Sequence, residues 1–384
     1  MLGFRWLATE AGAPDDSRYL TAVDRLADID RKMLQEFPKV NAAFAAPSPD
    51  LQNYVDSWLG RRDLRYVVVM VHGFDYDVSA FNRDTGQPVD PRNDPYNLVF
   101  ALPGKELAPV KPQSWLPIVG ETDDGGNLLA DRAIAFGWDS DYSFFGAHAC
   151  LENGYQYAAL DVAPLAGRAL ATLIATLRDK GMAVHVLSHS MGTRVTCQAL
   201  RQLADAGITD IVHRVVLLEG AEYSIDAYDA VRRHPDTEFY NIGNQDDDWP
   251  PRGGFDSHPF RYNGTVARWV IAYDGIANLP NLVDLQIDRK VVQTWAKKQG
   301  YDLSSSPITV NGHTRGEHWA GYIHVENRRF LRDLLTLAGR TVAWLRDTDA
   351  PLGFARHNYG ALDGVSVPIM PPTCDERRSM IRNT

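Results

Sequence analysis

The chain has few cysteines and no concentrated basic segment, and both shortages exclude classes of protein. Its three cysteines, Cys150, Cys197 and Cys374, are odd in number and widely spaced, so they provide neither a disulfide framework nor a zinc-binding spacing. We expect buried free thiols instead. Aspartate and glutamate (49) outnumber lysine and arginine (39), which gives a net charge of −10. An acidic chain without a basic run argues against a nucleic-acid partner.

Long apolar runs are also missing. No stretch approaches the roughly 18 consecutive apolar residues of a membrane-spanning helix. The apolar stretch at the start is too short and too soon interrupted for a signal peptide. The sequence therefore predicts a cytoplasmic protein with no membrane span. With 384 residues and 45% hydrophobic content, the chain can bury one large core, or a core domain with a substantial insertion.

Short, nearly continuous apolar runs predict a parallel β-sheet. They occupy 66–71, 133–138, 183–187, 215–218 and 239–242. Strands that are apolar on both faces are typical of a sheet covered on both sides. Between them, the stripes 170–177 and 195–203 carry apolar residues at helical spacing, and Gly181 and Gly207 follow as helix-ending residues. Strands alternating with helices predict the α/β class, with a mostly parallel central sheet and helices on both faces.

The less regular segments divide the chain into regions. Helix-like spacing predicts an N-terminal helical extension over 1–62, and the Pro-rich 349–384 form a surface tail. Between them, 63–348 hold the core. Two long insertions interrupt it, at about 79–130 and, rich in aromatic residues, at about 249–312. Long loops in compact domains are usually functional, so the aromatic insertion is either a lid over an active site or a packed surface subdomain.

A serine lies between a predicted strand and a predicted helix. The segment Ser188-His189-Ser190-Met191-Gly192 directly follows one apolar run, so Ser190 lies at a strand-to-helix turn that would expose its hydroxyl to solvent. Such a turn is strained and needs small neighbours, and we expect Ser188 and Gly192 to pack against each other. The pattern predicts a nucleophilic serine.

An acyl-transfer site also needs donors for the oxyanion. The apolar run 66–71 leads into His72-Gly73-Phe74, a turn at the carboxyl edge of the predicted sheet. The backbone N–H of Phe74 and that of Met191 are therefore predicted to form the oxyanion hole. His72 precedes the turn, which favours a structural hydrogen-bonding role over that of the base.

The general base is expected on a loop that leads into the last helix. His318 meets this description, ahead of the amphipathic pattern of 330–337. His313, which lies earlier in a polar loop, and His324, which lies nearer the helix, are the alternatives. We favour His318.

The acid that orients the base is expected after the run 239–242. The turn there, 243–248, ends in three consecutive aspartates. Asp246 and Asp247 both suit the role, with a narrow preference for Asp247, and Glu219 at the end of the preceding strand is a weaker candidate. Consecutive carboxylates lack the alternate spacing of a calcium loop, so no metal is predicted.

The order of these motifs resembles that of the α/β-hydrolase superfamily, over 66–337. Phe136-Gly137-Trp138-Asp139-Ser140, together with the serine motif, is similar to elements of esterase-like α/β hydrolases of poorly defined function. Two departures are Ser188, where glycine is usual, and a span of about 70 residues between acid and histidine, longer than an ordinary connection.

The resemblance implies an α/β-hydrolase fold with Ser190 as nucleophile, His318 as base and Asp247 or Asp246 as acid. The predicted reaction is hydrolysis of a small-molecule carboxylic ester through an acyl-serine, which requires no cofactor. Amide or thioester cleavage would use the same groups. From a different class, the chain could be a binding protein that kept the fold without turnover. The sequence carries no signal for an oligomeric state.

Overall fold

The structure is a computed structural model. It describes residues 3–6, 19–23, 49–59, 66–76, 95, 99–100, 115–119, 121–122, 128–129, 133–138, 140, 155, 158–244, 270–306, 308–310, 313–315, 324–336 and 339–354. The predicted site residues Asp246, Asp247 and His318 lie outside these ranges, whereas Ser190, Met191 and Phe74 lie within them.

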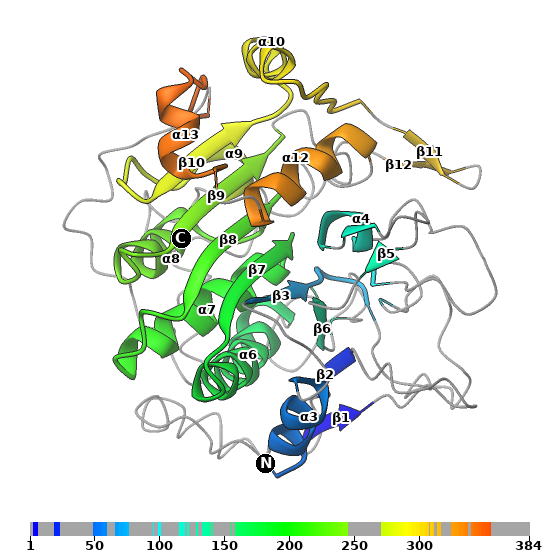
Figure 1. Ribbon diagram of the computed structural model, residues 1–384, viewed down its shortest axis with the longest axis vertical. Helices are drawn as coiled ribbons and strands as arrows, with labels where there is room; N and C mark the ends of the chain where they lie inside the picture. The colour runs from blue at the N-terminus through cyan, green and yellow to red at the C-terminus, as the bar shows by residue number, and fades with distance from the viewer. Residues whose placement is uncertain are drawn as a thin grey trace, which may run out of the picture.

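Eight of the described strands form one sheet, in the order β1-β2-β6-β3-β7-β8-β9-β10 (Figure 1). These strands are β1 (Gly3–Trp6), β2 (Tyr19–Val23), β3 (Tyr66–Val71), β6 (Ala133–Trp138), β7 (Ala183–His189), β8 (Val212–Leu218), β9 (Glu238–Gly243) and β10 (Leu282–Gln286). All neighbouring pairs are parallel except β1 with β2. Two short antiparallel pairs lie outside this sheet, β4 (Glu121–Thr122) with β5 (Leu128–Leu129), and β11 (Ile308–Val310) with β12 (His313–Arg315).

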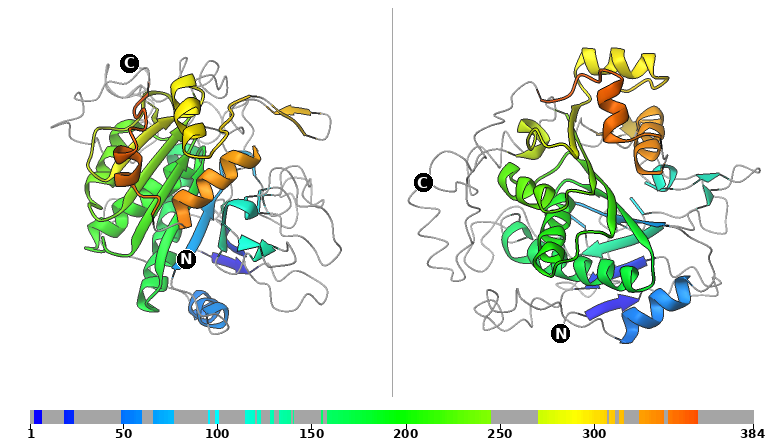
Figure 2. Two further views of the ribbon diagram at one scale, coloured as in Figure 1. Left: turned by 45° about the horizontal axis from the view of Figure 1, so that its top comes forward. Right: turned by 60° about the vertical axis from the view of Figure 1, so that its left-hand side comes forward.

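Helices cover both faces of the sheet, as Figure 2 shows. One face carries α3 (Pro49–Leu59), α6 (Ala163–Asp179), α7 (Gly192–Asp205), α8 (Ser224–Arg232) and α9 (Ile271–Asp274), and a short π-helix, η2 (Ala158–Val162), leads into α6. The other carries α4 (Leu116–Val119), α10 (Lys290–Lys298), α12 (Val325–Thr336) and α13 (Val342–Asp347). The result is a three-layer α/β architecture with a core on each side of the sheet.

The side-chain alternation of β3 explains why its sequence is apolar throughout. Val67, Val69 and Val71 belong to the core under α6 and α7, whereas Val68 and Met70 belong to the core under α12. Successive side chains of a strand point to opposite faces, so a strand covered on both sides has no solvent-facing position. The prediction of a mostly parallel sheet with helices on both faces is confirmed.

The two helices before and after β7 end as their sequences predict. Gly181 follows α6 with a φ of 74°, and Gly207 follows α7 with a φ of 72°. At the end of α6 the N–H of Met182 donates to the carbonyl of Leu177 at 3.1 Å, and that of Gly181 to Arg178 at 2.8 Å. These are the two hydrogen bonds of a Schellman motif, in which glycine takes the left-handed conformation at low cost.

The predicted aromatic insertion at 249–312 is wrong in part, because it contains β10. This strand pairs with β9 and belongs to the central sheet. The sequence conceals it because Asp284 interrupts its apolar residues. The buried Asp284 carboxylate accepts hydrogen bonds from Asn241 Nδ2 at 2.7 Å and from the N–H of Ile276 at 3.1 Å. A buried carboxylate with donors is tolerated in a core where an unpaired one is not.

Trp295, which the sequence assigned to the same aromatic insertion, packs in the core. It lies on α10, is 6% exposed, and its ring contacts those of Phe330 on α12 and Trp344 on α13. The described part of this segment is therefore a structural layer of the molecule. The aromatic residues between 249 and 269 lie outside the described residues.

Two other predicted boundaries also change. In the predicted helical extension 1–62, the described elements are β1 and β2, which join the sheet, and α3. The spacing of Leu20 and Val23 suits a helix, but Tyr19–Val23 is also rich in residues that favour strands, and pairing with β6 decides the outcome. In the predicted insertion 79–130, Phe100 and Trp115 are fully buried core residues.

No helix in the described ranges is long and apolar enough to cross a membrane.

Candidate active site

Ser190 occupies a strained turn between β7 and α7. Its φ is 52°, in the left-handed region that residues other than glycine rarely adopt. Its N–H donates to the carbonyl of Leu218 at 2.9 Å, and its carbonyl accepts from the N–H of Ala221 at 3.0 Å. A conformation that costs about 1–3 kcal/mol persists only where the surroundings fix it. Here the last residue of β8 and the chain just after it hold both sides of the turn, and the predicted strain is present.

The Ser190 side chain is more sheltered than its sequence predicts. We expected a hydroxyl in solvent, but the residue is only 6% exposed. The loop after β3 packs against it. A Cβ atom placed on Gly73 would lie 2.8 Å from Ser190 Cβ and 3.3 Å from its Oγ. The absence of a side chain at position 73 thus brings this backbone up to the hydroxyl.

Gly192 must lack a side chain because it packs against the end of β3, and not against Ser188 as the motif predicts. A Cβ atom there would lie 2.4 Å from the carbonyl oxygens of both Val71 and His72. The nearest obstacles are therefore backbone atoms at the end of β3, and not Ser188. Ser188 is fully buried in β7 and is paired in register with Val71.

The two predicted oxyanion donors lie beside the nucleophile turn. Met191 directly follows Ser190 and is the N-cap of α7, so its N–H lies at the positive end of a helix of 14 residues. Phe74 directly follows Gly73, and its ring packs edge-on against Tyr155 at 4.9 Å. Within the described part of the chain, neither N–H has a hydrogen-bond acceptor. Two donors next to one hydroxyl can stabilise a developing oxyanion.

His72 is a neutral structural residue. The N–H of Trp138 donates to His72 Nε2 at 3.0 Å, so the ring proton must be on Nδ1, which lies 2.9 Å from the Gly73 carbonyl oxygen and donates to it. The indole Nε1 of Trp138 donates to the His72 carbonyl at 2.8 Å. Complete burial lowers the pKa of His72 to about 3. The prediction that His72 is not the base is confirmed.

The side chains of the other described histidines are not hydrogen-bonded to the nucleophile hydroxyl either. His185 Nδ1 lies 2.5 Å from the carbonyl oxygen of Leu335, and His324 Nε2 lies 2.7 Å from that of Ser306. His324 immediately precedes α12, as its sequence predicts. Among the histidines with described side chains, none is hydrogen-bonded to Ser190 Oγ. These histidines are His72, His185, His189, His213, His234 and His324.

The alternative base His313 lies in β12, and only its backbone is described. His318 follows it in 316–323, outside the described residues. The long span between the predicted acid and this histidine has a structural reason. It contains α9, β10, α10 and the β11–β12 pair, so it is an elaborated connection and not one loop.

Glu219, the weaker candidate for the acid, is a buried carboxylate at the carboxyl edge of the sheet. It directly follows β8, beside the nucleophile strand, and it is 2% exposed. Its φ is 43°, and its Oε2 accepts a hydrogen bond from the N–H of Asn244 at 2.8 Å. Asn244 is the last described residue before Asp246 and Asp247 in the chain. The position of Glu219 at the end of the strand next to β7 is the sequence signal that identifies it.

A buried ion pair anchors the first turn of α7. The guanidinium of Arg194 pairs with Glu222, and its Nε donates to the carbonyl of Ala159 at 2.6 Å. Burial raises the pKa of Glu222 to about 7, and the positive charge of Arg194 opposes this rise. The pair connects the helix after Ser190 to the loop after β8 and to η2. It therefore fixes the orientation of α7 relative to the sheet.

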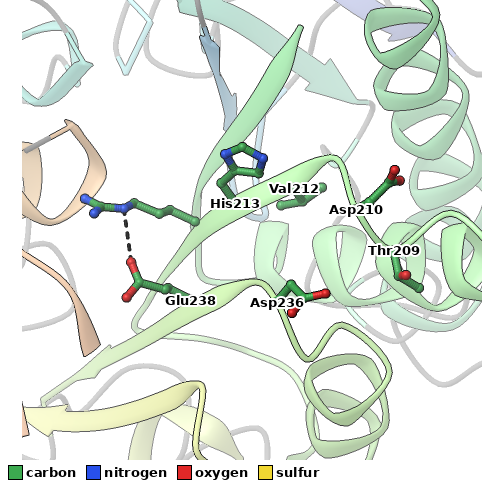
Figure 3. Close-up of a pocket in the computed structure, with 7 residues that line it drawn as sticks. Thr209, Asp210, Val212, His213, Asp236 and Glu238 are labelled. Atoms are coloured by element: carbon green, nitrogen blue, oxygen red, sulfur yellow. Dashed lines mark ion pairs between the residues drawn. The ribbon is translucent and has the colours of Figure 1, made fainter. Parts of the chain in front are cut away.

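A cavity of about 440 Å³ lies at the other end of the strands (Figure 3). Val212 and Glu238, the first residues of β8 and β9, belong to its lining, together with Thr209, Asp210, His213, Arg214 and Asp236. Arg214 Nε and Glu238 Oε2, on the neighbouring strands β8 and β9, are 3.2 Å apart. Ser190 follows the last residue of a parallel strand, so this cavity is at the opposite edge of the sheet from the candidate site. The described residues contain no cluster of three or more His, Cys, Asp or Glu residues that could hold a metal ion.

A comparison with protein families supports the same fold. Residues 49–220 match the model of a family described as "Alpha/beta hydrolase of unknown function (DUF900)". The matched segment runs from α3 through the Ser190 turn to the end of β8. No match was found among the curated proteins or among the solved structures.

Substitution of Gly73 tests how closely β3 approaches the nucleophile turn. We expect Gly73→Ala to lower the free energy of unfolding by about 1–3 kcal/mol, because the added methyl group overlaps Ser190 Cβ and overpacking has a cost of this size. Gly339→Ala is the matched control, since a Cβ atom there meets nothing within 4 Å. Urea unfolding measures both variants. Equal stability of the two would contradict the close approach.

Burial of neutral His72 predicts a dependence of stability on pH. The unfolded state takes up a proton near pH 6.5, whereas the folded state resists protonation down to about pH 3. The contribution is therefore complete above pH 6.5 and is lost as the pH falls toward 3, by about 2 kcal/mol between pH 7 and pH 5. Urea unfolding of the wild type and of His72→Gln at both pH values measures it. We expect the wild type to lose more stability than the variant by this amount, and parallel losses would refute the neutral histidine.

Proposed function

We propose that the chain is a serine hydrolase that cleaves a carboxylic ester through an acyl-serine intermediate, because residues 49–220 match the model of an α/β-hydrolase family. One observation carries the proposal. The Gly73 backbone lies against the buried Ser190 side chain, so the two proposed oxyanion donors, Phe74 and Met191, each directly follow one of these two contacting residues in the chain. A small-molecule ester is the proposed substrate.

In the proposed mechanism, Ser190 Oγ attacks the ester carbonyl carbon while the base takes its proton. The N–H groups of Phe74 and Met191 stabilise the oxyanion of the tetrahedral intermediate. The protonated base then gives its proton to the leaving alcohol, which leaves an acyl-serine. Water, deprotonated by the same base, attacks this ester and releases the acid and free Ser190.

His318 is the proposed base. None of the described histidine side chains is hydrogen-bonded to Ser190 Oγ, and His72, His185 and His324 are bonded elsewhere, which favours a histidine outside the described residues. His318 lies between β12 and α12, after the last strand of the central sheet. That order, with the base last in the chain, is usual for this fold. Asp247 is the proposed acid, with Asp246 as its alternative.

Amide and thioester cleavage are variants of the same proposal. They need the same nucleophile, base and oxyanion donors and differ in how the leaving group is protonated. A binding role without turnover is the competing function, because a fold alone does not establish activity. The strained backbone of Ser190 favours catalysis, since strain of this kind concentrates at functional sites.

Covalent labelling of Ser190 tests the proposal. A fluorophosphonate probe should label the wild type, and Ser190→Ala should abolish labelling and lower kcat for a short aryl ester by at least about 10⁴-fold, because the nucleophile is lost. Ser188→Ala is the control, since it removes a buried serine hydroxyl two residues away. Labelling without ester turnover would redirect the proposal to amides or thioesters. A folded wild type that is not labelled would favour the binding role.

The identity of the acid is tested by three separate substitutions, Asp246→Asn, Asp247→Asn and Glu219→Gln. We expect Asp247→Asn to lower kcat by as much as about 10⁴-fold, because the base loses the partner that orients it. The other two should have much smaller effects on kcat for the same aryl ester. A large loss in Glu219→Gln with small losses in both aspartate variants would transfer the role to Glu219, beside the nucleophile strand.

A further inference from the structure

The loop after β3 is fastened to the end of β6 by hydrogen bonds that converge on Ser140. Its backbone N–H donates to the carbonyl of Tyr76 at 3.1 Å, and its carbonyl accepts from the N–H of Asp75 at 3.1 Å. Its hydroxyl accepts from the N–H of Tyr76 at 3.1 Å and donates to the carbonyl of Gly73 at 2.9 Å. Ser140 is fully buried. It thus binds the loop through both its backbone and its side chain.

The carbonyl of Gly73 accepts two of the hydrogen bonds around this loop. One comes from Ser140 Oγ and the other from His72 Nδ1, each at 2.9 Å. A carbonyl oxygen has two lone pairs, so these two donors use its full capacity and determine its direction. Both donors are uncharged and fully buried, and the Ser140 hydroxyl lies closer to the Gly73 carbonyl, at 2.9 Å, than to that of Tyr76, at 3.3 Å.

The direction of this carbonyl determines that of the next N–H. The Gly73 carbonyl and the Phe74 N–H belong to one planar trans peptide unit, in which the two groups point in opposite directions. In the sheet, β3 lies between β6 and β7. Because the carbonyl is held on the β6 side by Ser140, the N–H faces the β7 side, where Ser190 lies.

We propose that Ser140, assisted by His72, is a positioning residue that aims the Phe74 N–H at the oxyanion by holding the Gly73 carbonyl on the opposite side of the same peptide unit. This inference rests on the proposed serine hydrolase function. It gives a role to the Trp138-Asp139-Ser140 motif: Trp138 N–H fixes the tautomer of His72, and Ser140 supplies the second donor. Neither residue is required to touch the substrate.

The inference predicts that loss of the Ser140 hydroxyl weakens stabilisation of the transition state and leaves substrate binding unchanged. Removal of an entire oxyanion donor lowers kcat by about 10²–10³-fold, so a loosened donor should lower it by at least about 10-fold. Ser140→Ala should therefore reduce kcat for a short aryl ester by at least about 10-fold, with KM within about twofold. Inhibition by a trifluoromethyl ketone, whose tetrahedral adduct puts an oxyanion in the same place, should weaken by a similar factor.

Ser224→Ala is the matched control. Ser224 is also a buried serine whose hydroxyl donates to a glycine carbonyl, that of Gly275, at 2.7 Å. Its removal should cost similar stability, measured by urea unfolding, and leave kcat and ketone inhibition at wild-type values. Equal kinetic losses in both serine variants would reduce the effect to general destabilisation and overturn the inference.

The remaining outcomes separate the inference from the function on which it rests. If the wild type neither reacts with fluorophosphonate nor hydrolyses the ester, the proposed function fails. If the wild type is active and Ser140→Ala keeps kcat or ketone inhibition within about twofold, or raises KM alone, positioning fails and the function stands. If Ser140→Ala does not fold, Ser140→Cys takes its place, because it has nearly the same volume and a thiol is only a weak donor.

Discussion

Close contact between the end of β3 and the turn after β7 is the constraint on which the candidate site depends. Gly73 lies against the Ser190 side chain, and Gly192 lies against the carbonyls of Val71 and His72, with no room for a Cβ atom at either glycine. The two glycines let the segment after β3 and the turn after β7 stay in close contact beyond the last paired residues of these two parallel strands. That contact brings the backbone at Gly73 next to the Ser190 hydroxyl, and larger residues at the two glycine positions would prevent it.

Backbone strain is concentrated along the same edge. Asp75, Ser190 and Glu219 follow three adjacent strands, β3, β7 and β8, and each has a positive φ although none is glycine. Hydrogen bonds hold each of them in place: the Asp75 N–H donates to Ser140, the Ser190 N–H to Leu218 and the Glu219 N–H to Ile242. Each conformation costs about 1–3 kcal/mol. The packing of the central sheet offsets this cost. The strands thus hold the strained residues at their carboxyl ends in place.

The sequence predicts the parts of this arrangement that depend on local patterns. Apolar runs identify the parallel strands, glycines identify the ends of α6 and α7, and small flanking residues identify the turn at Ser190. β10 escapes prediction because Asp284, a buried carboxylate with partners from distant segments, looks like a loop residue. The burial of Ser190 is not predicted either, because it results from packing against Gly73, a residue far away in the sequence. Asp246, Asp247 and His318 stay predictions.

The ion pair between Arg194 and Glu222 has a consequence for how uniquely the chain folds. Apolar residues of similar size could fill that space without loss of stability, but they would lack the directional charge–charge contact. Separating two buried opposite charges leaves each without its partner, and an uncompensated buried charge costs about 3–5 kcal/mol, so a displacement of α7 that broke the pair would be disfavoured. The pair thus discriminates against misregistered packing of the helix whose first turn follows the nucleophile.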